Sequence, residues 1–227
     1  MSNCVVRFGG SSLSKFPVLE AFASLLSKSG NDETIVISAV PEIQQVIEQG
    51  IELLASNAAT SESIIEQIHQ HVIERLKLFG QSEANENLRQ EFKSLQNLLK
   101  GIEFTGDFSL SLKDQVISYS ERITASILQL FLTSKQISST IAFPEDIGLK
   151  VTKEYGNATI LYDESADLRN KLPKGINLIP GSYGVTLNGK IARLGKRSAD
   201  YRDWETDRKS TRLNSSHSGE SRMPSSA

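Results

Sequence analysis

The chain lacks the features that mark secreted and membrane-bound proteins. Its 227 residues include a single cysteine, Cys4, which cannot form a disulfide within the chain, so a reducing compartment is favoured. The apolar run at residues 4–8 is too short for the hydrophobic region of a signal peptide. No run approaches the roughly 18 apolar residues of a membrane span. We therefore predict a cytoplasmic protein that has no membrane partner.

The chain also has little net charge and no obvious metal ligands. Lys and Arg number 25 and Asp and Glu number 27, so no excess of positive charge favours a nucleic-acid partner. His69 and His71 are two residues apart on a predicted helix and face nearly opposite directions. No spacing matches a zinc site. The sequence therefore predicts no metal site built from side chains.

The N-terminal segment follows the pattern of an α/β layered fold. Residues 4–8 are a short β-rich run, typical of a buried strand, that ends at Gly9-Gly10. Pro17 stands near the start of a helical repeat, where a first-turn proline is tolerated, and residues 34–38 form a second β-rich run. The order strand, glycine turn, helix and strand predicts an α/β protein.

The following residues continue this alternation of helices and strands. Apolar residues at helical spacing predict three surface helices and then one largely buried helix, at residues 43–54, 65–79, 88–102 and 112–131. Shorter elements are predicted next, with strands at 139–142, 149–151 and 176–179 and a helix at 163–172. A hairpin is predicted over residues 185–191, because Asn188-Gly189 can supply the φ > 0 residues of a type I′ turn.

Residues 202–227 differ in composition from the preceding chain. They are mostly Ser, Arg, Asp, Glu and Thr without a period of 2 or 3.6, and the only tryptophan, Trp204, has no apolar neighbours there. The segment resembles translated sequencing-adapter DNA joined to a truncated gene, so we interpret it as a non-native tail. The alternative is a native extension, which at this composition would be disordered. The predicted division is therefore a domain at residues 1–201 and a tail at 202–227.

The first candidate site is the glycine turn after the first strand, Arg7-Phe8-Gly9-Gly10-Ser11-Ser12. Two glycines let the backbone approach a ligand closely, and the N–H groups of the following helix favour a phosphate. The turn matches neither a Walker A loop nor a Rossmann fingerprint. An ordinary strand-to-helix turn explains the motif equally well.

Two further motifs also follow predicted strands. Ser38 stands at the C-terminal end of the second strand, where parallel sheets place ligands, although a simple strand terminus is the more common explanation. Gly181 and Gly184 form a Gly-x-x-Gly turn after the strand at 176–179. Such a turn can approach a phosphate or carboxylate closely, or it can be a plain loop.

Two charged motifs complete the candidates. Glu121 lies on the flank of the apolar arc of the helix at 112–131, where a carboxylate without a partner costs several kcal/mol. A substrate ammonium group is one candidate partner, and a neighbouring Lys or Arg is the other. Lys196 and Arg197 precede Asp200, an arrangement that suits an acidic substrate and a developing phosphoryl charge, or else a solvated loop.

Taken in order, these motifs resemble the aspartate kinase branch of the amino-acid kinase family, over about residues 3–201. The family carries Lys-Phe-Gly-Gly-Ser/Thr-Ser, Ser-Ala, a Gly-Glu-Arg-like helix, Gly-Phe-x-Gly and Leu-Gly-Arg-Gly-Gly-Ser-Asp-Tyr. Their counterparts here are Arg7-Phe8-Gly9-Gly10-Ser11-Ser12, Ser38-Ala39, Ser120-Glu121-Arg122, Gly181-Ser182-Tyr183-Gly184 and Leu194-Gly195-Lys196-Arg197-Ser198-Ala199-Asp200-Tyr201. The long helical insertion between Pro41 and Gly101 favours the aspartate branch.

The resemblance implies a three-layer αβα sandwich with a mainly parallel sheet. It implies transfer of the γ-phosphoryl group of ATP, with Mg²⁺, to the side-chain carboxylate of aspartate, the first step towards lysine, threonine and methionine. It also implies a homo-oligomer in the full-length form.

The resemblance also implies roles for single residues. Those implied to face the ATP phosphates are Arg7, Phe8, Gly9, Gly10, Ser11, Ser38, Gly181 and Gly184. Glu121 would hold the substrate ammonium and Lys196 a substrate carboxylate, and Asp200 would orient groups at the transfer site, with Arg7 and Asp200 as catalytic residues. The other implied substrate contacts are Gln44, which falls where the family often has a threonine, and Arg197, Ser198 and Ala199.

Several of these positions depart from the family pattern. Arg7 replaces a lysine, Lys196 replaces an arginine, and Arg197 and Ser198 replace a glycine pair. Two alternatives therefore stay open: a non-catalytic relative that binds a nucleotide or amino acid, and a kinase of another small acid. The family continues with strands that hold the nucleotide base. We therefore expect an incomplete ATP site and negligible kinase activity in the 227-residue polypeptide, which a coupled ADP-release assay tests.

Overall fold

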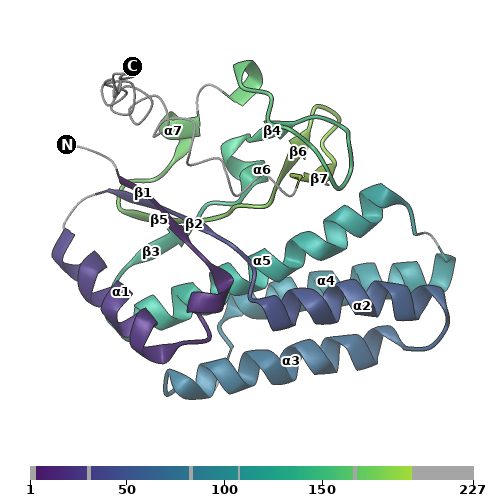
Figure 1. The fold of residues 1–227 in the computed structure, drawn as a ribbon, viewed down its shortest axis with the longest axis horizontal. Coiled ribbons are helices and arrows are strands. Elements are labelled where there is room, and N and C mark those ends of the chain that lie inside the picture. The colour runs from purple at the N-terminus through teal and green to yellow at the C-terminus, as the bar shows by residue number, and fades with distance from the viewer. Residues whose placement is uncertain (1–3, 30–31, 82–83, 107, 166–167, 196–227) are drawn as a thin grey trace, which may run out of the picture. The chain divides into compact units, whose positions relative to one another are not determined.

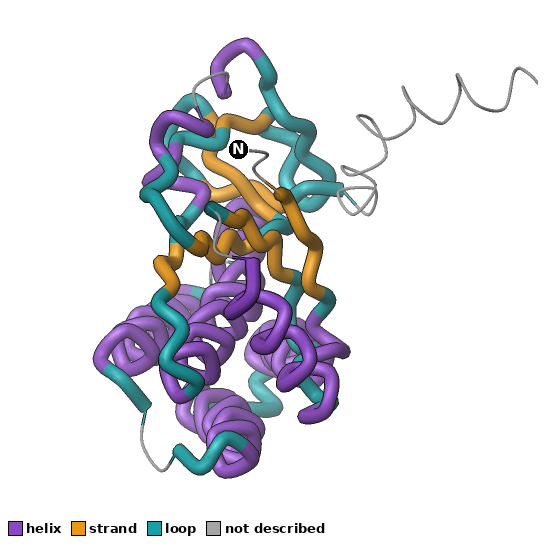
Figure 2. The backbone as a smooth tube through the Cα atoms, turned by 90° about the vertical axis from the view of Figure 1, so that its left-hand side faces the viewer, coloured by secondary structure: helices purple, strands orange, loops and turns teal. Residues whose placement is uncertain are grey.

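A computed structural model describes residues 4–29, 32–81, 84–106, 108–165 and 168–195 of the chain. The described residues belong to one compact unit that contains two β-sheets and a thick helical layer. Figure 1 shows helices α1 to α5 on one side of the larger sheet and the short helices α6 and α7 on the other, and Figure 2 shows the same layers from the side. The α/β fold class with a mainly parallel sheet, as predicted, is confirmed.

The larger sheet consists of four parallel strands in the order β1-β2-β5-β3. They are β1 (Cys4–Phe8), β2 (Glu33–Ile37), β5 (Ile176–Pro180) and β3 (Ser139–Ile141). Each lies within about one residue of its predicted position. The expectation of a buried first strand is wrong, because β1 forms one edge of this sheet and its Val5 is 55% exposed. Inner strands β2 and β5 bury Ile35, Ile37 and Leu178 completely.

Five long helices form the helical layer, and all were predicted from apolar spacing. They are α1 (Phe16–Ser29), α2 (Pro41–Ala55), α3 (Ser61–Leu78), α4 (Glu86–Thr105) and α5 (Leu110–Ser134). Local signals fix their ends: Thr60 and Ser63 form a capping box at the start of α3, and Asn85 caps α4. Gly106 ends α4 in the left-handed conformation, at φ 66°.

Helix α5 is the central element of the unit. It packs against α2 and α4 on one side and against strands of both sheets on the other. Its buried side chains lie around most of its circumference, from Val116 and Ile117 to Phe131 and Leu132, as the wide apolar arc predicted. A polar residue on α5 is therefore held in a dry and well-packed position.

The smaller sheet contains β4 (Lys150–Val151), β6 (Tyr183–Thr186) and β7 (Ile191–Arg193). Strands β6 and β7 form the predicted hairpin. The predicted type I′ turn is wrong, because Gly189 has φ 77° whereas Asn188 is not among the described residues with positive φ. Thr186 O accepts from the Gly189 N–H at 2.9 Å, and Thr186 Oγ1 accepts from the Lys190 N–H at 3.1 Å, so a single left-handed glycine closes the turn.

The short elements complete the unit. A 3-10 turn, η1 (Gly10–Ser12), follows β1, and α6 (Pro144–Ile147) follows β3. The helix predicted at residues 163–172 is wrong in its extent, because two separate pieces occur there, η2 (Asp163–Ser165) and α7 (Leu168–Lys171). The predicted division of the chain after residue 201 falls outside the described residues. None of the described helices is long and apolar enough to cross a membrane.

Replacement of Gly10 by alanine should destabilise the fold strongly. A Cβ at this position would lie 1.7 Å from the carbonyl oxygen of Ala39, which is backbone and cannot rotate away. We expect a loss of about 3 kcal/mol in the free energy of unfolding, measured by urea denaturation. Gly101→Ala is the control, because it meets nothing within 4 Å in the exposed interior of α4 and should gain about 0.5–1 kcal/mol. Equal effects of the two changes would contradict the close approach at Gly10.

Candidate active site

The predicted motifs converge at one edge of the larger sheet. Gly9, Ser38 and Gly181 directly follow β1, β2 and β5, and because these strands are parallel and adjacent, all three residues lie at the same end of the sheet. Hydrogen bonds join the segments there: the Ser38 N–H donates to Phe8 O at 3.1 Å, and the Gly181 N–H donates to Ile37 O at 3.0 Å. Ligands of parallel sheets bind outside this end of the strands.

The two glycines after β1 differ in whether the surrounding chain leaves space for a side chain. Gly10 is buried against the Ala39–Val40 backbone, so packing alone requires it. At Gly9 an added Cβ would meet nothing closer than Ser11 Oγ at 3.9 Å. Packing within the chain therefore does not explain Gly9, and its backbone is open to a close approach. A guanidinium nitrogen of Arg7, Nη2, lies 3.4 Å from Ser38 Oγ beside this turn.

The helix whose N-terminus lies at this turn is α2, and the sequence-based expectation that it is the helix directly after the turn is wrong. Helix α1 begins at Phe16, beyond the 3-10 turn, whereas the N-cap of α2, Val40, contacts Gly10. Val40 offers no side-chain cap, so the first N–H groups of α2 remain available to an anion. Pro41 at the first helical position was the sequence signal for this helix start.

Gly181 and Gly184 are explained by close packing between strands. An added Cβ at Gly181 would lie 2.4 Å from Val36 Cγ1, and one at Gly184 would lie 2.5 Å from Val151 Cγ1 and 2.9 Å from Leu149 O. Phe8 likewise turns its side chain into the core, where it stacks on Phe22. These three residues can contribute to a ligand site only through their backbone.

Glu121 lies on α5 at the same end of the sheet and is 3% exposed. Its Oε2 accepts a hydrogen bond of 2.7 Å from the N–H of Ser182, in the loop after β5. Burial raises the pKa of Glu121 to about 7, although the bond from Ser182, the positive charge of Arg193 and the N–H of Ala39 act in the opposite direction. Among the described residues no Lys or Arg pairs with it within 4 Å. Glu121 can thus gain a cationic partner near neutral pH.

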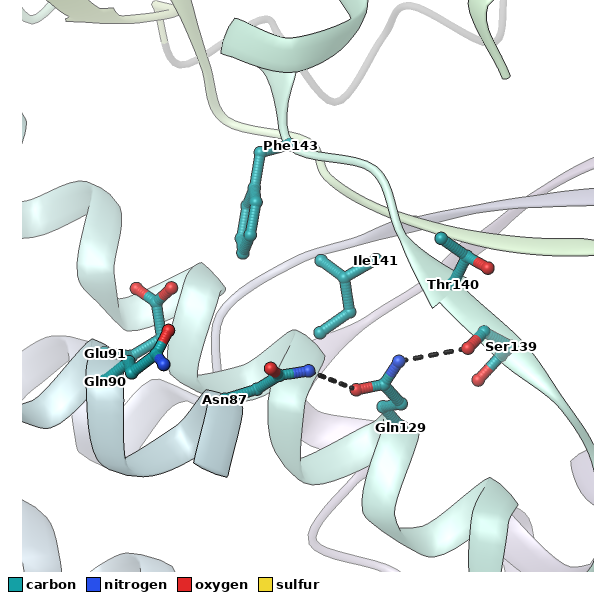
Figure 3. Close-up of a pocket in the computed structure, with 8 residues that line it drawn as sticks. All are labelled: Asn87, Gln90, Glu91, Gln129, Ser139, Thr140, Ile141 and Phe143. Carbon is teal, nitrogen blue, oxygen red and sulfur yellow. Dashed lines mark hydrogen bonds between the residues drawn. The ribbon is translucent and has the colours of Figure 1, made fainter. Parts of the chain in front are cut away.

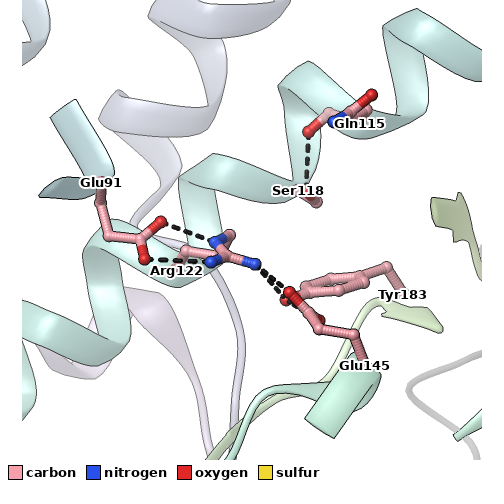
Figure 4. Close-up of polar contacts among 6 residues, drawn as sticks. All are labelled: Glu91, Gln115, Ser118, Arg122, Glu145 and Tyr183. Atoms are coloured by element: carbon pink, nitrogen blue, oxygen red, sulfur yellow. Dashed lines mark hydrogen bonds and ion pairs between the residues drawn. The ribbon is translucent and has the colours of Figure 1, made fainter. Parts of the chain in front are cut away.

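The neighbouring residue on α5, Arg122, is the one that forms internal ion pairs (Figure 4). Its Nε and Nη2 bind the two carboxylate oxygens of Glu91 on α4, at 2.6 and 3.0 Å. Its Nη1 pairs with Glu145 on α6 and lies 3.4 Å from Tyr183 Oη. The Phe143 ring lies 4.0 Å from the guanidinium. Arg122 on α5 therefore contacts α4, α6 and β6, and β6 directly follows Ser182, whose N–H binds Glu121.

Tyr183 connects this network to the candidate site. Its ring is fully buried, and burial raises the pKa of its hydroxyl well above the ordinary value, so the hydroxyl stays protonated and donates to Glu145 at 3.2 Å. Ser182 immediately precedes it in the chain. Anchoring the Tyr183 side chain therefore also holds the Ser182 N–H against Glu121.

A second charged group faces the site from β7. Arg193 Nη1 lies 3.5 Å from Glu48 Oε1 on α2, and Glu48 Oε1 also accepts a 2.9 Å bond from the Gln44 amide. Glu48 thus links the predicted residue Gln44 to Arg193. No sequence motif pointed to Arg193 or Glu48, because nothing in a hairpin strand indicates which helix its side chains contact.

A hollow of about 250 Å³ lies between β3, α4 and α5 (Figure 3). Amide and hydroxyl side chains line much of it, and within it Asn87 donates to Gln129, which donates to Ser139 O. It contains none of the predicted site residues. Two of its lining residues, Glu91 and Phe143, contact Arg122 and connect the hollow to the ion-pair network.

The last predicted motif lies outside the described residues. Lys196, Arg197, Ser198, Ala199 and Asp200 all belong to the undescribed segment, so their roles stay predictions. In the described part of the chain no three His, Cys, Asp or Glu side chains gather as metal ligands.

Replacement of Arg122 by methionine should destabilise the unit strongly. It would leave the Glu91 carboxylate, 10% exposed, without a partner and would also unpair Glu145. We expect a loss of about 3–5 kcal/mol in unfolding free energy, measured by urea denaturation. The matched control is Lys135→Met, which removes the cation of the exposed Lys135–Glu20 pair and should cost less than about 1 kcal/mol. A loss at Arg122 as small as that of the control would show that the network does not stabilise the fold.

Comparisons with known proteins agree with this geometry. The model of the amino acid kinase family matches residues 3–201. Aspartokinase 3 of Bacillus subtilis (strain 168) is 25% identical over 203 residues, which cover 86% of this chain and 44% of that protein. Aspartokinase 1, chloroplastic, of Arabidopsis thaliana is 26% identical over 211 residues, covering 87% of this chain and 36% of the relative. The chain thus spans less than half the length of these curated relatives.

Solved structures show the same fold. Aspartokinase III of E. coli, in complex with aspartate and ADP, superposes with a TM-score of 0.71 at 17% identity and covers 88% of this chain and 45% of its own. The aspartate kinase of Clostridium acetobutylicum superposes with a TM-score of 0.64 at 17% identity, and the match covers 86% of this chain and 42% of that chain. With the family model matched from residue 3 to residue 201, the chain belongs to the amino acid kinase family.

Proposed function

We propose that this chain provides the aspartate-binding part of an ATP-dependent aspartate kinase, which phosphorylates the side-chain carboxylate of aspartate. Its curated relatives are named aspartokinases, and the E. coli relative was solved with aspartate and ADP. The product would enter the biosynthesis of lysine, threonine and methionine. We further propose that the enzyme acts in the cytoplasm and assembles as a homo-oligomer in its full-length form.

The observation that carries this proposal is the buried carboxylate of Glu121. It lies at the ligand-binding end of a parallel sheet, next to two loops that follow strands, and its described partners are the Ser182 and Ala39 N–H groups and the Ser182 side chain. A carboxylate in so dry a position binds a substrate ammonium far more strongly than an exposed one would. Glu121 would therefore fix the amino group of the substrate and orient its side-chain carboxylate.

The opposite side of the site suits the phosphates of ATP. Gly9 leaves its backbone open, Arg7 contributes positive charge, and the uncapped start of α2 presents N–H groups nearby. Gly10, Ser11 and Ser38 would complete the contacts. Phosphoryl transfer requires positioning and neutralisation of charge more than a covalent catalyst. Mg²⁺ would be held by the phosphates together with residues of the chain and would neutralise the charge that develops on the transferred group.

The Lys196–Asp200 motif completes the proposal. We propose that Lys196 contacts a substrate carboxylate with Arg197, Ser198 and Ala199 beside it, and that Asp200 orients groups at the transfer site. The support for these roles is the resemblance of the motif and the short connection from Leu194, whose N–H donates to Ser182 O at 2.7 Å.

Glu121→Gln should greatly weaken the binding of aspartate by the 227-residue chain, as measured by isothermal titration calorimetry. The glutamine keeps an oxygen for the Ser182 N–H but cannot pair with an ammonium group. We expect the affinity to fall by a factor of about 100. The control is Glu52→Gln, an exposed glutamate on α2, which should leave the affinity unchanged. Undiminished binding by Glu121→Gln would refute the proposed site.

The same variant should be more stable than the wild type at pH 8, so lost binding cannot be ascribed to unfolding. Because the pKa of Glu121 is about 7 when folded and 4.5 as an ordinary glutamate, the stability that it contributes is lost as pH rises from 4.5 to 7. Removing the charge should raise the free energy of unfolding by up to about 3 kcal/mol at pH 8. Thermal unfolding at pH 4 and pH 8 measures this, and a variant less stable than wild type at both would contradict the assignment.

Aspartate affinity should rise with pH between 6 and 8 and then level off. Glu121 must be ionised to bind an ammonium group, and with its pKa at about 7 in the free chain it is mostly protonated at pH 6. Below this pKa we expect the affinity to fall by up to about tenfold per pH unit. Calorimetry across this range tests the expectation, and an affinity that does not change between pH 6 and 8 would exclude Glu121 as the titrating ligand.

A further inference from the structure

We propose that Arg75 on α3 is a positioning residue for the phosphate side of the site. It binds the carboxylate of Glu42 and so prevents this side chain from capping the N-terminus of α2, which stays open to a phosphate. The inference rests on the proposed function, because it assumes that the glycine turn and the start of α2 receive the phosphates of ATP. Neither residue belongs to a motif found in the sequence.

Two N–H groups in the first turn of α2 are open to an anion. Pro41 has no N–H, and the Val40 N–H donates to Thr124 Oγ1 at 3.0 Å. The next two, those of Glu42 and Ile43, have no acceptor among the described residues. Because the N-cap of α2 contacts the glycine turn, both donors lie close to the place proposed for the phosphates.

The side chain of Glu42 is a competitor for this place. A carboxylate in the first turn of a helix is attracted to the free N–H groups and to the positive end of the helix dipole. Glu42 itself carries one of the two free donors, so its carboxylate is covalently tied to the neighbourhood of the site. Left without a partner, it would occupy the donors and repel a phosphate of the same charge.

Arg75 binds this carboxylate from a buried position. Its Nη2 lies 2.9 Å from Glu42 Oε2, and its side chain is 7% exposed whereas that of Glu42 is 46% exposed. Nη2 also donates to Ser14 Oγ at 3.3 Å, just beyond the glycine turn, and Nη1 donates to His71 O at 3.0 Å. The guanidinium is therefore fixed by three partners, and it holds the Glu42 carboxylate on the side of α3.

Stability alone does not account for an arginine at this position. The Nε of Arg75 is buried and has no hydrogen-bond partner among the described residues, and a buried donor left unsatisfied is destabilising. An ion pair taken out of water is seldom more stable than apolar packing of similar volume. The neighbouring buried positions of α3 are indeed aliphatic: Ile64, Ile68, Val72 and Leu76.

The chain contains a matched pair that lacks this role. Glu62 stands in the first turn of α3 and pairs with Lys100 on α4 at 3.0 Å. At this helix start Thr60 and Ser63 form a capping box, so the chain itself satisfies the N-terminus. Lys100→Met therefore changes the net charge as Arg75→Met does, and it also leaves a first-turn glutamate without its cation, but at a helix that is not proposed to bind phosphate.

The competing explanation is that Arg75 only fastens α3 to α2. The two explanations differ in the effect of Glu42→Gln. If Arg75 restrains a competing carboxylate, Glu42→Gln removes the competitor, so phosphate affinity stays the same or rises, and it recovers in the Arg75→Met background. If the pair is purely structural, Glu42→Gln weakens phosphate binding as Arg75→Met does, and the double variant is no better than Arg75→Met.

The test uses inorganic tripolyphosphate, which presents phosphates without a nucleoside. Titration calorimetry at low salt on the full 227-residue chain gives its affinity for the wild type, both single variants and the double variant. We expect Arg75→Met to weaken binding roughly tenfold, and Glu42→Gln in that background to restore it to within about twofold of wild type. Arg75→Lys, which keeps the charge, should lose about threefold at most, and Lys100→Met should stay within about twofold of wild type.

Each outcome decides between the explanations. Undiminished affinity in Arg75→Met, a double variant as weak as Arg75→Met, or an equal loss in Lys100→Met overturns the role of Arg75 and leaves the proposed function intact. A wild-type chain that binds aspartate but not tripolyphosphate overturns this inference and the phosphate side of the proposed function, while the aspartate side stands. If Arg75→Met fails to fold, as seen by circular dichroism, Glu42→Gln alone decides, because binding weaker than that of the wild type then overturns the inference.

Discussion

The hydrogen bond between Ser182 N–H and the Glu121 carboxylate is the contact on which the proposed site depends. It joins a helix that is buried around most of its circumference to a loop that leaves the central strand β5. The donors from Ser182 and Ala39 do not neutralise a carboxylate in such surroundings, so Glu121 keeps a raised affinity for protons and for cations. A position that destabilises the free protein is thereby suited to select an ammonium group, a trade between stability and function that active sites often show.

Two adjacent charged residues on α5, Glu121 and Arg122, have different roles. Arg122 turns away from the candidate site and binds Glu91 and Glu145, which joins α4, α5 and α6 and holds Tyr183. Glu121 turns towards the ends of the strands, where it meets Ser182. The rigid ion-pair network thus supports the loop that sets the geometry of Glu121. Such a division explains how a helix can carry two buried charges of opposite sign that do not neutralise each other.

Much of this arrangement follows from the sequence, and the failures have physical causes. Helical spacing located α1 to α5, and the wide apolar arc of α5 placed Glu121 in a buried position. The edge position of β1 could not be predicted, because strand order depends on long-range pairing. A glycine motif does not show whether the glycine leaves room for a ligand or for a neighbouring strand. Gly181 and Gly184 were therefore predicted as ligand contacts like Gly9, although of these three Gly9 alone has space for a Cβ. Arg193 was missed because its partners belong to distant helices.

The most direct test of the central claim is a crystal structure of the chain grown with aspartate at pH 8. The account predicts that the amino nitrogen of aspartate lies about 2.7–3.0 Å from a carboxylate oxygen of Glu121, at the C-terminal ends of β2 and β5. Aspartate bound elsewhere, such as in the hollow beside Gln129, or bound at this end of the sheet with its amino group directed away from Glu121, would contradict it.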